Sequence, residues 1–226
     1  MEMESKVRLL STVSVLAHLK TEELQQLAEV GQLCHTPRFN FIFMPDEPAR
    51  HVYILAKGRV KIGTFASDGR EIIKDILRPG ALFGDLALAG ETQRSEYAQN
   101  LHDEAEYLSI SVQDWQQAMS TNQCLVFACI QHLSQRLQRV EERLTKLVIK
   151  DARERIIEFI TETASREGRR VGLETLIRHQ LTQQDIASLT GTSRQTVTSV
   201  FNDLRKSNLI HFNRNTILIR DIAKLA

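Results

Sequence analysis

The C-terminal fold is decided by the stretch Leu181-Thr-Gln-Gln-Asp-Ile-Ala-Ser-Leu-Thr-Gly-Thr-Ser-Arg-Gln-Thr-Val-Thr-Ser-Val-Phe-Asn-Asp-Leu-Arg-Lys-Ser-Asn-Leu209. Thr182 is followed three residues later by Asp185, a capping-box pattern that predicts the start of a helix. Gly191 then interrupts the helical pattern and suits the left-handed backbone of a sharp turn. Ser193 is a favourable N-cap for a second helix. The stretch therefore predicts two helices joined by a tight turn.

The second helix has one apolar and one polar face. Its apolar residues recur at helical spacing and should pack inward: Val197, Val200, Phe201 and Leu204. The outer face carries Arg194, Gln195, Thr198 and Ser199. Arginine can bind guanine through two parallel hydrogen bonds, and glutamine can do the same for adenine. This face is typical of a recognition helix in the major groove. The alternative is an ordinary helical hairpin whose polar residues are only solvated.

A short hairpin is predicted to follow. Leu209, Ile210 and Phe212, and then residues 216–219, form two β-prone runs around Asn213-Arg214-Asn215. Asparagine tolerates left-handed turn geometry, so these runs predict a wing beside the two helices. Arg214 at the tip could reach a DNA phosphate; the alternative is a solvated side chain.

The whole segment resembles the winged helix of the Crp/Fnr family of regulators. The residues that carry the resemblance are Leu181-Thr-x-x-Asp-Ile-Ala, Gly191-x-Ser-Arg-x-Thr-Val and Asn208-Leu-Ile. The resemblance implies that Thr182, Ser193 and Thr196 bind phosphates and that Arg194 binds a guanine. Gln195 and Ser199 stand where the cyclic-AMP-responsive members have Glu and a second base-reading Arg. A different operator with the same docking mode is therefore expected.

The charge of the chain is unevenly divided. The formal net charge is only +1, yet residues 146–226 carry 14 Lys and Arg against 9 Asp and Glu. The remaining 145 residues carry 15 basic against 19 acidic residues. The positive charge therefore lies with the predicted winged helix, as binding to phosphates requires.

Composition indicates a soluble, cytoplasmic protein. The 226 residues are 42% hydrophobic and 25% charged, which is typical of globular domains. No run of 18 apolar residues predicts a membrane span, and residues 1–6 lack the features of a secretory signal. Cys34, Cys124 and Cys129 show no metal-ligand spacing, so we expect reduced, structural thiols; redox sensing by one of them is the alternative.

A long helix with a single apolar seam is predicted between the two halves. The seam residues recur at alternating spacings of 4 and 3: Val126, Ile130, Leu133, Leu137, Val140, Leu144 and Leu147. Such a period over about three heptads is typical of a coiled coil. We therefore expect this helix to form a homodimer interface; packing on its own domain is the alternative.

The N-terminal half is predicted to be an antiparallel β-structure. Short β-prone runs begin near residues 39, 51, 59 and 72, and turn signals such as Asp68-Gly69 separate them. Leu24, Leu27 and neighbouring apolar residues predict short helices before them. The order Gly58-Arg-Val-Lys-Ile, Asp68-Gly-Arg-Glu, Arg78-Pro-Gly80, Phe83-Gly-Asp-Leu86 and Arg94-Ser95 resembles the cyclic-nucleotide-binding β-roll.

The resemblance thus covers nearly the whole chain and implies an α+β fold in three parts. We expect a β-roll sensor over residues 1–121, a dimerisation helix over 122–149 and a winged helix-turn-helix over 150–226. By position, the resemblance assigns five residues to the effector: Gly84, Asp85, Leu86, Arg94 and Ser95.

Several departures weaken the expectation of cyclic AMP as effector. Asp85 replaces a Glu and is shorter, and the loop before Arg94 is one residue shorter than in the cyclic-AMP-responsive members. The adenine-facing positions correspond to Val140 and Glu141, and an ionised Glu cannot donate a hydrogen bond. A cyclic nucleotide, a small carboxylate held by Arg94, and no ligand all remain open. A further alternative is a salt bridge between Arg94 and Asp85 that braces an empty roll.

The sequence lacks the usual catalytic and cofactor motifs. It contains no phosphate loop, nucleophile elbow, H-E-x-x-H pair or G-x-G-x-x-G, so we expect no enzyme activity. No metal site, iron–sulfur cluster or haem is expected. The expected function is a homodimeric transcriptional regulator that binds double-stranded DNA, with RNA polymerase as a candidate partner. The alternative is a cyclic-nucleotide-binding interaction module without DNA-binding activity.

Overall fold

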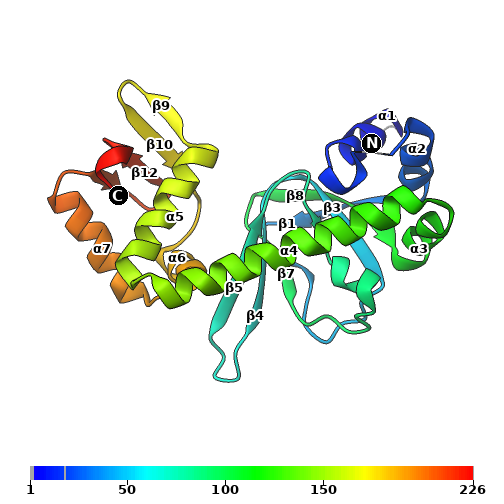
Figure 1. Cartoon of the computed structure of the whole chain (residues 1–226), viewed down its shortest axis with the longest axis horizontal. Helices are drawn as coiled ribbons and strands as arrows, with labels where there is room; N and C mark the ends of the chain where they lie inside the picture. The colour runs from blue at the N-terminus through cyan, green and yellow to red at the C-terminus, as the bar shows by residue number, and fades with distance from the viewer. Residues whose placement is uncertain (1–2, 18, 226) are drawn as a thin grey trace. The chain divides into compact units, whose positions relative to one another are not determined.

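The computed structural model describes residues 3–17 and 19–225. The expectation that residues 1–6 lack a secretory signal therefore falls partly, at residues 1 and 2, outside the described residues. The chain divides into two compact units, Met1–Gln138 and Arg139–Ala226. The division falls within the long helix α4 (Gln123–Ile149), which forms one uninterrupted element (Figure 1). The long helix was expected over residues 122–149; it begins one residue later and ends at the expected residue.

The N-terminal unit contains two four-stranded antiparallel sheets, so the predicted β-roll is confirmed. The strand orders are β1-β8-β3-β6 and β2-β7-β4-β5. The strands are β1 (Gln32–Pro37), β2 (Phe41–Phe43), β3 (His51–Lys57), β4 (Val60–Phe65), β5 (Glu71–Leu77), β6 (Leu82–Phe83), β7 (Tyr97–Asn100) and β8 (Glu104–Ser111).

The predicted Asp68-Gly69 turn joins β4 to β5. Gly69 has a φ of 81°, a left-handed conformation that residues with a side chain rarely adopt. Its N–H donates to the carbonyl of Ala66 at 2.9 Å, and the N–H of Arg70 donates to the carboxylate of Asp68 at 3.1 Å. The local chemistry of the Asp-Gly pair therefore closes this hairpin.

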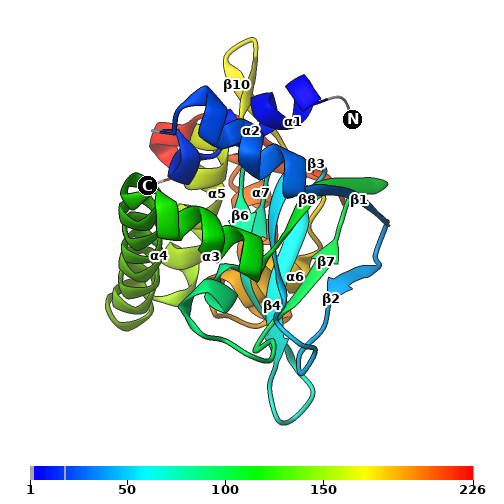
Figure 2. The ribbon, with the colours of Figure 1, turned by 90° about the vertical axis from the view of Figure 1, so that its right-hand side faces the viewer.

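Short helices pack together at one end of the roll, where α2 and α3 both contact β8 (Figure 2). Besides α4, the helices of this unit are α1 (Met3–Ser11), α2 (Thr21–Val30), α3 (Val112–Thr121) and two 3-10 helices, η1 (Ser14–Leu16) and η2 (Asp85–Ala89). The apolar spacing before the roll thus predicted α2 correctly.

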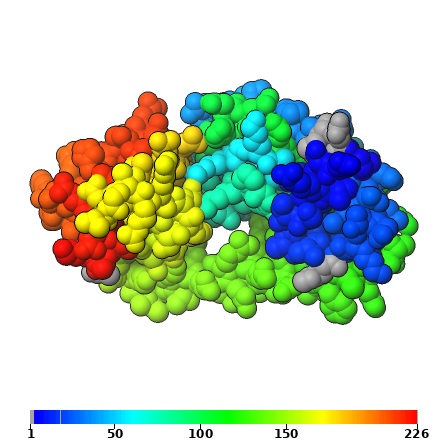
Figure 3. All heavy atoms as spheres, turned by 90° about the horizontal axis from the view of Figure 1, so that it is seen from above, coloured from blue at the N-terminus to red at the C-terminus, as the bar shows by residue number. Residues whose placement is uncertain are grey.

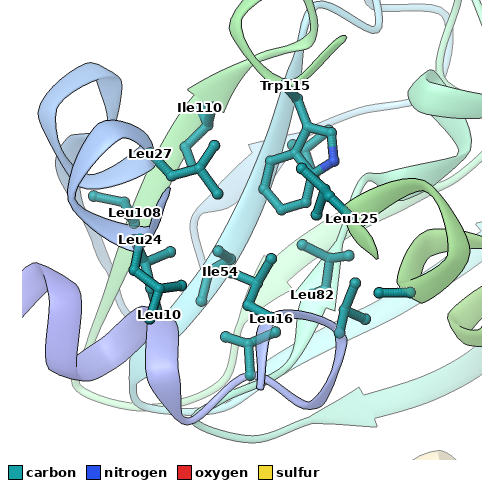
Figure 4. Packing of buried hydrophobic residues seen from close by; sticks show 14 of the residues in the cluster. Leu10, Leu16, Leu24, Leu27, Ile54, Leu82, Leu108, Ile110, Trp115 and Leu125 are labelled. Atoms are coloured by element: carbon teal, nitrogen blue, oxygen red, sulfur yellow. The ribbon is translucent and has the colours of Figure 1, made fainter. Parts of the chain in front are cut away.

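The core of the N-terminal unit lies between these helices and one sheet. Figure 4 shows leucines of α1, η1 and α2 facing apolar residues of β3, β6 and β8. Trp115 of α3 lies among them and is fully buried, as is Leu125 of α4. Burial of these apolar side chains stabilises the sheet and the helices as one body.

In its described residues, the C-terminal unit combines three α-helices of its own and one 3-10 helix with a four-stranded sheet of order β11-β12-β10-β9. Its elements are α5 (Ala152–Glu167), β9 (Arg169–Val171), β10 (Glu174–Arg178), α6 (Gln183–Thr190), α7 (Arg194–Lys206), β11 (Ile210–Phe212), β12 (Thr216–Ile219) and the 3-10 helix η3 (Ile222–Lys224). The predicted helix-turn-helix and wing are confirmed. The hairpin of β9 and β10 was not predicted; in Figure 3 it forms part of the yellow surface of this unit.

Among the described residues, no helix combines the length and the apolar character needed to cross a membrane.

Candidate nucleic-acid interface and effector site

The helix-turn-helix is built by the caps that the sequence predicts. The hydroxyl of Thr182 accepts the N–H of Asp185 at 3.1 Å, and the Asp185 carboxylate accepts the N–H of Thr182 at 2.7 Å. Gly191 ends α6 with a φ of 62°. Ser193 caps α7 and accepts the N–H of Thr196 at 3.1 Å. These local bonds fix where α6 ends and where α7 begins.

Helix α7 has the two faces that the sequence predicts. Val197, Val200, Phe201 and Leu204 are all buried. Arg194, Gln195 and Ser199 are exposed, and Thr196 is half-buried. The exposed side chains lie on the first two turns, which is the part of a recognition helix that contacts base edges.

Some predicted contact groups already have partners within the unit. The hydroxyl of Thr198 lies 2.6 Å from Oε1 of Gln183 and 2.8 Å from the carbonyl of Arg194. Its one proton is therefore shared between an acceptor on α6 and an acceptor on α7. The hydroxyls of Ser193 and Thr196 lie 2.8 Å apart at the exposed start of α7. The hydroxyl of Thr182 is likewise engaged, since it donates to the Asp185 carboxylate at 2.7 Å.

The wing differs from the expected turn geometry. Asn213 and Asn215 do not adopt left-handed backbone; instead the Asn213 side chain accepts the N–H groups of Asn215 and Thr216 at 3.0 and 2.9 Å. The left-handed residue in this region is Asn208, two residues after the end of α7, with a φ of 61°. Arg214 is exposed at the tip of the wing, as predicted.

Two arginines hold the end of α6, a contact that the sequence does not reveal. Arg143 of α4 donates to the carbonyls of Ser188 and Leu189 at 3.2 and 2.9 Å. Arg155 of α5 donates to the carbonyls of Thr190 and Gly191 at 2.8 and 3.1 Å. The carbonyls at a helix C-terminus lack partners within the helix and attract positive charge.

Leu147 of α4 packs against the same turn. A Cβ atom added at Gly191 would lie 2.6 Å from Cδ2 of Leu147, closer than such atoms approach. The left-handed backbone is what favours glycine at position 191, because the flexible Leu147 side chain could move away from an added Cβ atom. The last turns of α4 therefore pack with the winged helix in the C-terminal unit.

The predicted effector residues lie together in the roll, around η2 and the loop that follows it. Gly84 has a φ of 68° and precedes η2, Asp85 is buried, and Leu86 is half-buried. Ser95 is exposed, and its hydroxyl donates to Oε1 of Glu91 at 2.6 Å.

Arg94 is buried but does not pair with Asp85. Its Nη1 donates to the carbonyl of Gly84 at 2.9 Å, and its Nη2 donates to the carbonyl of His51. Its guanidinium lies 4.5 Å from the centre of the Phe43 ring, a cation–π distance. The alternative of an Arg94–Asp85 salt bridge is therefore wrong, because Arg94 binds backbone carbonyls.

Asp85 pairs with the long helix instead. Its two carboxylate oxygens lie 2.7 Å from Nη1 of Arg136 and 3.1 Å from Nε2 of His132. Burial by itself would raise the pKa of Asp85, but the hydrogen bond from His132 and the charge of Arg136 hold it below the usual value. Neither His132 nor Arg136 was identified from the sequence.

The apolar seam of α4 is largely uncovered within one chain. Leu137, Val140 and Leu144 are 58%, 59% and 61% exposed, and Ile130 and Leu147 are also exposed. Val126 and Leu133 are half-buried. Large apolar side chains exposed in a row are typical of an interaction surface.

The three cysteines are free thiols. Burial raises the pKa of Cys34 and Cys129, which disfavours the reactive thiolate. Among the described residues, His35, Glu104 and Glu106 bring three possible metal ligands within 4.8 Å of one another. Lys57 lies 3.2 Å from Glu106 and competes for it.

The fold and these two sites define a protein with a cyclic-nucleotide-binding-type roll and a DNA-binding winged helix. A family model of the cyclic nucleotide-binding domain matches residues 34–122, and one of the Crp-like helix-turn-helix domain matches residues 154–226. The chain belongs to the Crp/Fnr family of transcriptional regulators.

Curated relatives align along most of the chain. A CRP-like cAMP-activated global transcriptional regulator of Mycobacterium tuberculosis is 28% identical over 96% of this chain and 97% of its own. A global nitrogen regulator of Synechocystis is 30% identical over 84% of each chain. The c-di-GMP responsive regulator CLP of Xanthomonas campestris has the same fold, with a TM-score of 0.78 at 21% identity, covering 89% of this chain and 100% of that one. The signals named for these relatives differ, so membership of the family does not identify an effector.

Proposed function

We propose that this regulator acts as a cytoplasmic homodimer on two-fold symmetric DNA, and that its β-roll senses a small molecule other than cyclic AMP. Binding of that molecule would reposition the two recognition helices. The observation that carries the proposal is the exposed first two turns of α7, which present Arg194 and Gln195 on a helix-turn-helix braced by Arg143 and Arg155. An exposed polar start on a rigidly held helix is what reading of base edges requires.

Arg194 and Gln195 are the proposed base readers, and Thr182, Ser193, Thr196 and Arg214 the proposed phosphate contacts. Ser199 and Thr198 lie on the second turn, where Ser199 is the more accessible of the two. Because serine is short, we expect it to contribute less selectivity than a second arginine would.

The exposed seam of α4 supports dimerisation. A monomer would leave a row of leucines and valines in water, whereas a parallel coiled coil would bury them. One recognition helix reads few base pairs, and two related by a two-fold axis read half-sites about one helical turn apart. DNA binding and dimerisation are therefore proposed to be linked.

A sensor role for the roll is supported by the position of Asp85 and Arg94 beside η2. The engagement of Asp85 by His132 and Arg136 disfavours cyclic AMP, because a ribose hydroxyl would compete with two hydrogen-bond partners for the same carboxylate. An effector shifts a population of conformations only if it binds one of them more tightly.

A salt titration separates the regulator from the alternative, an interaction module without DNA-binding activity. Purified protein is titrated into non-specific duplex DNA at two salt concentrations. A DNA-binding protein loses affinity steeply as salt rises, because bound counterions are released from the DNA. Absence of any salt-dependent binding would favour the interaction module. The relatives are named as regulators, and we propose that this chain likewise has no enzyme activity.

Replacing Arg194 with alanine should weaken binding to the selected operator by about 1–3 kcal/mol and relax the preference at one base pair. The operator is first obtained by selection from random duplexes. Competition binding of wild type and Arg194→Ala then measures both effects. Arg166→Ala removes an equal charge from an exposed position of α5 and serves as the control. Equal binding of wild type and Arg194→Ala would rule out Arg194 as a base reader.

Replacing Arg214 with alanine should have a different signature. If the wing tip binds a phosphate, affinity falls about equally for operator and non-specific DNA, and the salt slope falls by about one. Binding isotherms at four salt concentrations measure the slope. A change of base preference in Arg214→Ala would instead assign the wing to base reading.

A further inference from the structure

A hydrogen bond between two side chains joins α6 to α7 beside the exposed start of α7. Gln183 is the first residue of α6, and Thr198 lies on the second turn of α7. The hydroxyl of Thr198 lies 2.6 Å from Oε1 of Gln183. Both side chains are half-buried, and both belong to the C-terminal unit.

The length of this contact indicates which way the amide of Gln183 is turned. Hydrogen bonds from a hydroxyl to an oxygen are typically about 2.7–2.8 Å long, whereas those from an N–H group to an oxygen are about 2.9–3.0 Å long. A distance of 2.6 Å therefore identifies the amide oxygen, and not the amide nitrogen, as the partner of the Thr198 hydroxyl. The nitrogen Nε2 lies on the other branch of the amide and is directed away from that hydroxyl.

The amide nitrogen of Gln183 carries two N–H groups that the protein does not use. Among residues 3–17 and 19–225, which the structure describes, Nε2 of Gln183 donates to no acceptor. Because the side chain is half-buried, water can accept from these N–H groups in the free protein. An acceptor oxygen of a bound ligand can take the place of that water.

The position of the amide favours a phosphate over a base as this acceptor. When a helix-turn-helix binds DNA, its second helix lies in the major groove and its first helix crosses the sugar–phosphate backbone. Gln183 begins the first helix, α6, directly after the exposed cap residue Thr182. Glutamine amides are among the groups that bind phosphate oxygens and thereby fix the register of a protein on the duplex.

We propose that Gln183 donates its amide N–H groups to a DNA phosphate, and that Thr198 is a positioning residue that holds the amide in the orientation required for this contact. The proposal rests on the proposed function, because α7 has to lie in the major groove for the start of α6 to reach the backbone. Neither residue contacts a base in this arrangement. The pair therefore contributes to affinity and register and not to base preference.

The role of Thr198 follows from the bonds of its single proton. Its acceptors are Oε1 of Gln183 at 2.6 Å and the carbonyl of Arg194 at 2.8 Å, and both lie within the protein. The hydroxyl thus has no second proton to donate to DNA. Any effect of Thr198 on DNA binding should pass through the amide of Gln183.

Substitutions of Gln183 test the phosphate contact. Gln183→Glu keeps the shape of the side chain and an acceptor for Thr198, but it replaces the amide nitrogen with an oxygen of a negatively charged group. The affinities for the selected operator and for non-specific duplex DNA should each fall by about tenfold or more, because the donor is lost and the carboxylate repels the phosphate. The control Ser165→Glu adds the same charge at an exposed position of α5 and should bind like wild type.

Gln183→Ala separates the loss of the amide from the added charge. It should lower the affinities for operator and non-specific DNA by the same factor, and that factor should be smaller than for Gln183→Glu. The salt slope should stay unchanged, since a neutral amide releases no counterion from the DNA. Competition binding at four salt concentrations measures the affinities and the slope.

Substitutions of Thr198 test the positioning. Thr198→Val keeps the shape of the side chain without its hydroxyl, so the affinity should fall by no more than in Gln183→Ala. The double variant should bind as Gln183→Ala alone does, because the two side chains act as one unit. Thr198→Ser keeps the hydroxyl and should bind like wild type. Circular dichroism confirms that each variant is folded before it is compared.

Failure of this inference and failure of the proposed function give different results. If Thr198→Val weakens binding equally in the wild-type and Gln183→Ala backgrounds, Thr198 contacts DNA itself and the inference is overturned. A changed base preference in a Gln183 variant, or wild-type binding by both of them, overturns it as well, while the proposed function stands. If wild type shows no salt-dependent DNA binding, the proposed function fails and the phosphate contact fails with it.

Discussion

The double variant Leu137→Asp/Leu144→Asp is expected to be monomeric and to lose operator affinity by about 10²- to 10⁴-fold. Both leucines are exposed in one chain and lie on the predicted seam, so aspartates there would face one another across the dimer axis. Without the dimer, the two recognition helices bind as separate molecules and lose the benefit of a high effective concentration. Analytical ultracentrifugation measures the oligomeric state, and competition binding measures the affinity.

The matched control for this variant is Leu173→Asp, which changes a leucine that is 90% exposed in the turn between β9 and β10. The control should stay dimeric and should bind the operator like wild type. Binding of non-specific DNA by the seam variant should weaken far less than operator binding, because each winged helix keeps its phosphate contacts. A seam variant that remains dimeric would show that a different surface forms the dimer.

The second large effect is expected from Trp115→Ala in the core of the N-terminal unit. Trp115 is fully buried between the helices and the sheet, and its removal leaves a cavity that the surrounding leucines fill only in part. The expected cost is about 3–5 kcal/mol of unfolding free energy. This is a large fraction of the stability of an ordinary domain.

Chemical denaturation followed by circular dichroism measures this loss, since the variant removes the single tryptophan that fluorescence would follow. Trp115→Phe keeps most of the apolar volume and should cost clearly less. A Trp115→Ala protein with an unchanged unfolding midpoint would mean that this core does not limit the stability of the chain.

The parts of the fold that the sequence predicts well are those set by neighbouring residues. The caps at Thr182 and Ser193, the turn at Gly191 and the Asp68-Gly69 hairpin depend on bonds across a few residues, so a local pattern is sufficient. The seam of α4 can also be predicted from the sequence, because helical spacing alone defines it. From these local features, the order of the roll, the long helix and the winged helix along the chain could also be predicted.

The features that the sequence does not reveal depend on distant contacts. β10 pairs with β12, and the paired residues are about forty positions apart in the sequence. No local sequence pattern predicts such a pairing. The partners of Asp85 are 47 and 51 residues away on α4. The resemblance placed Gly84, Asp85 and Arg94 close together, as the structure does, but it did not identify their hydrogen-bond partners. The partners of Asp85 depend on which face of α4 lies against the roll.

The clamp formed by Arg143, Arg155 and Leu147 has a mechanical consequence for the winged helix. The end of α6 and the turn that follows it accept two hydrogen bonds from Arg143 of α4 and two from Arg155 of α5, and the Leu147 side chain of α4 lies beside Gly191. Under the proposed function, we expect a rotation of the last turns of α4 to move the start of α7, and Arg194 with it. The stiffness of the clamp would determine how much of the rotation reaches Arg194.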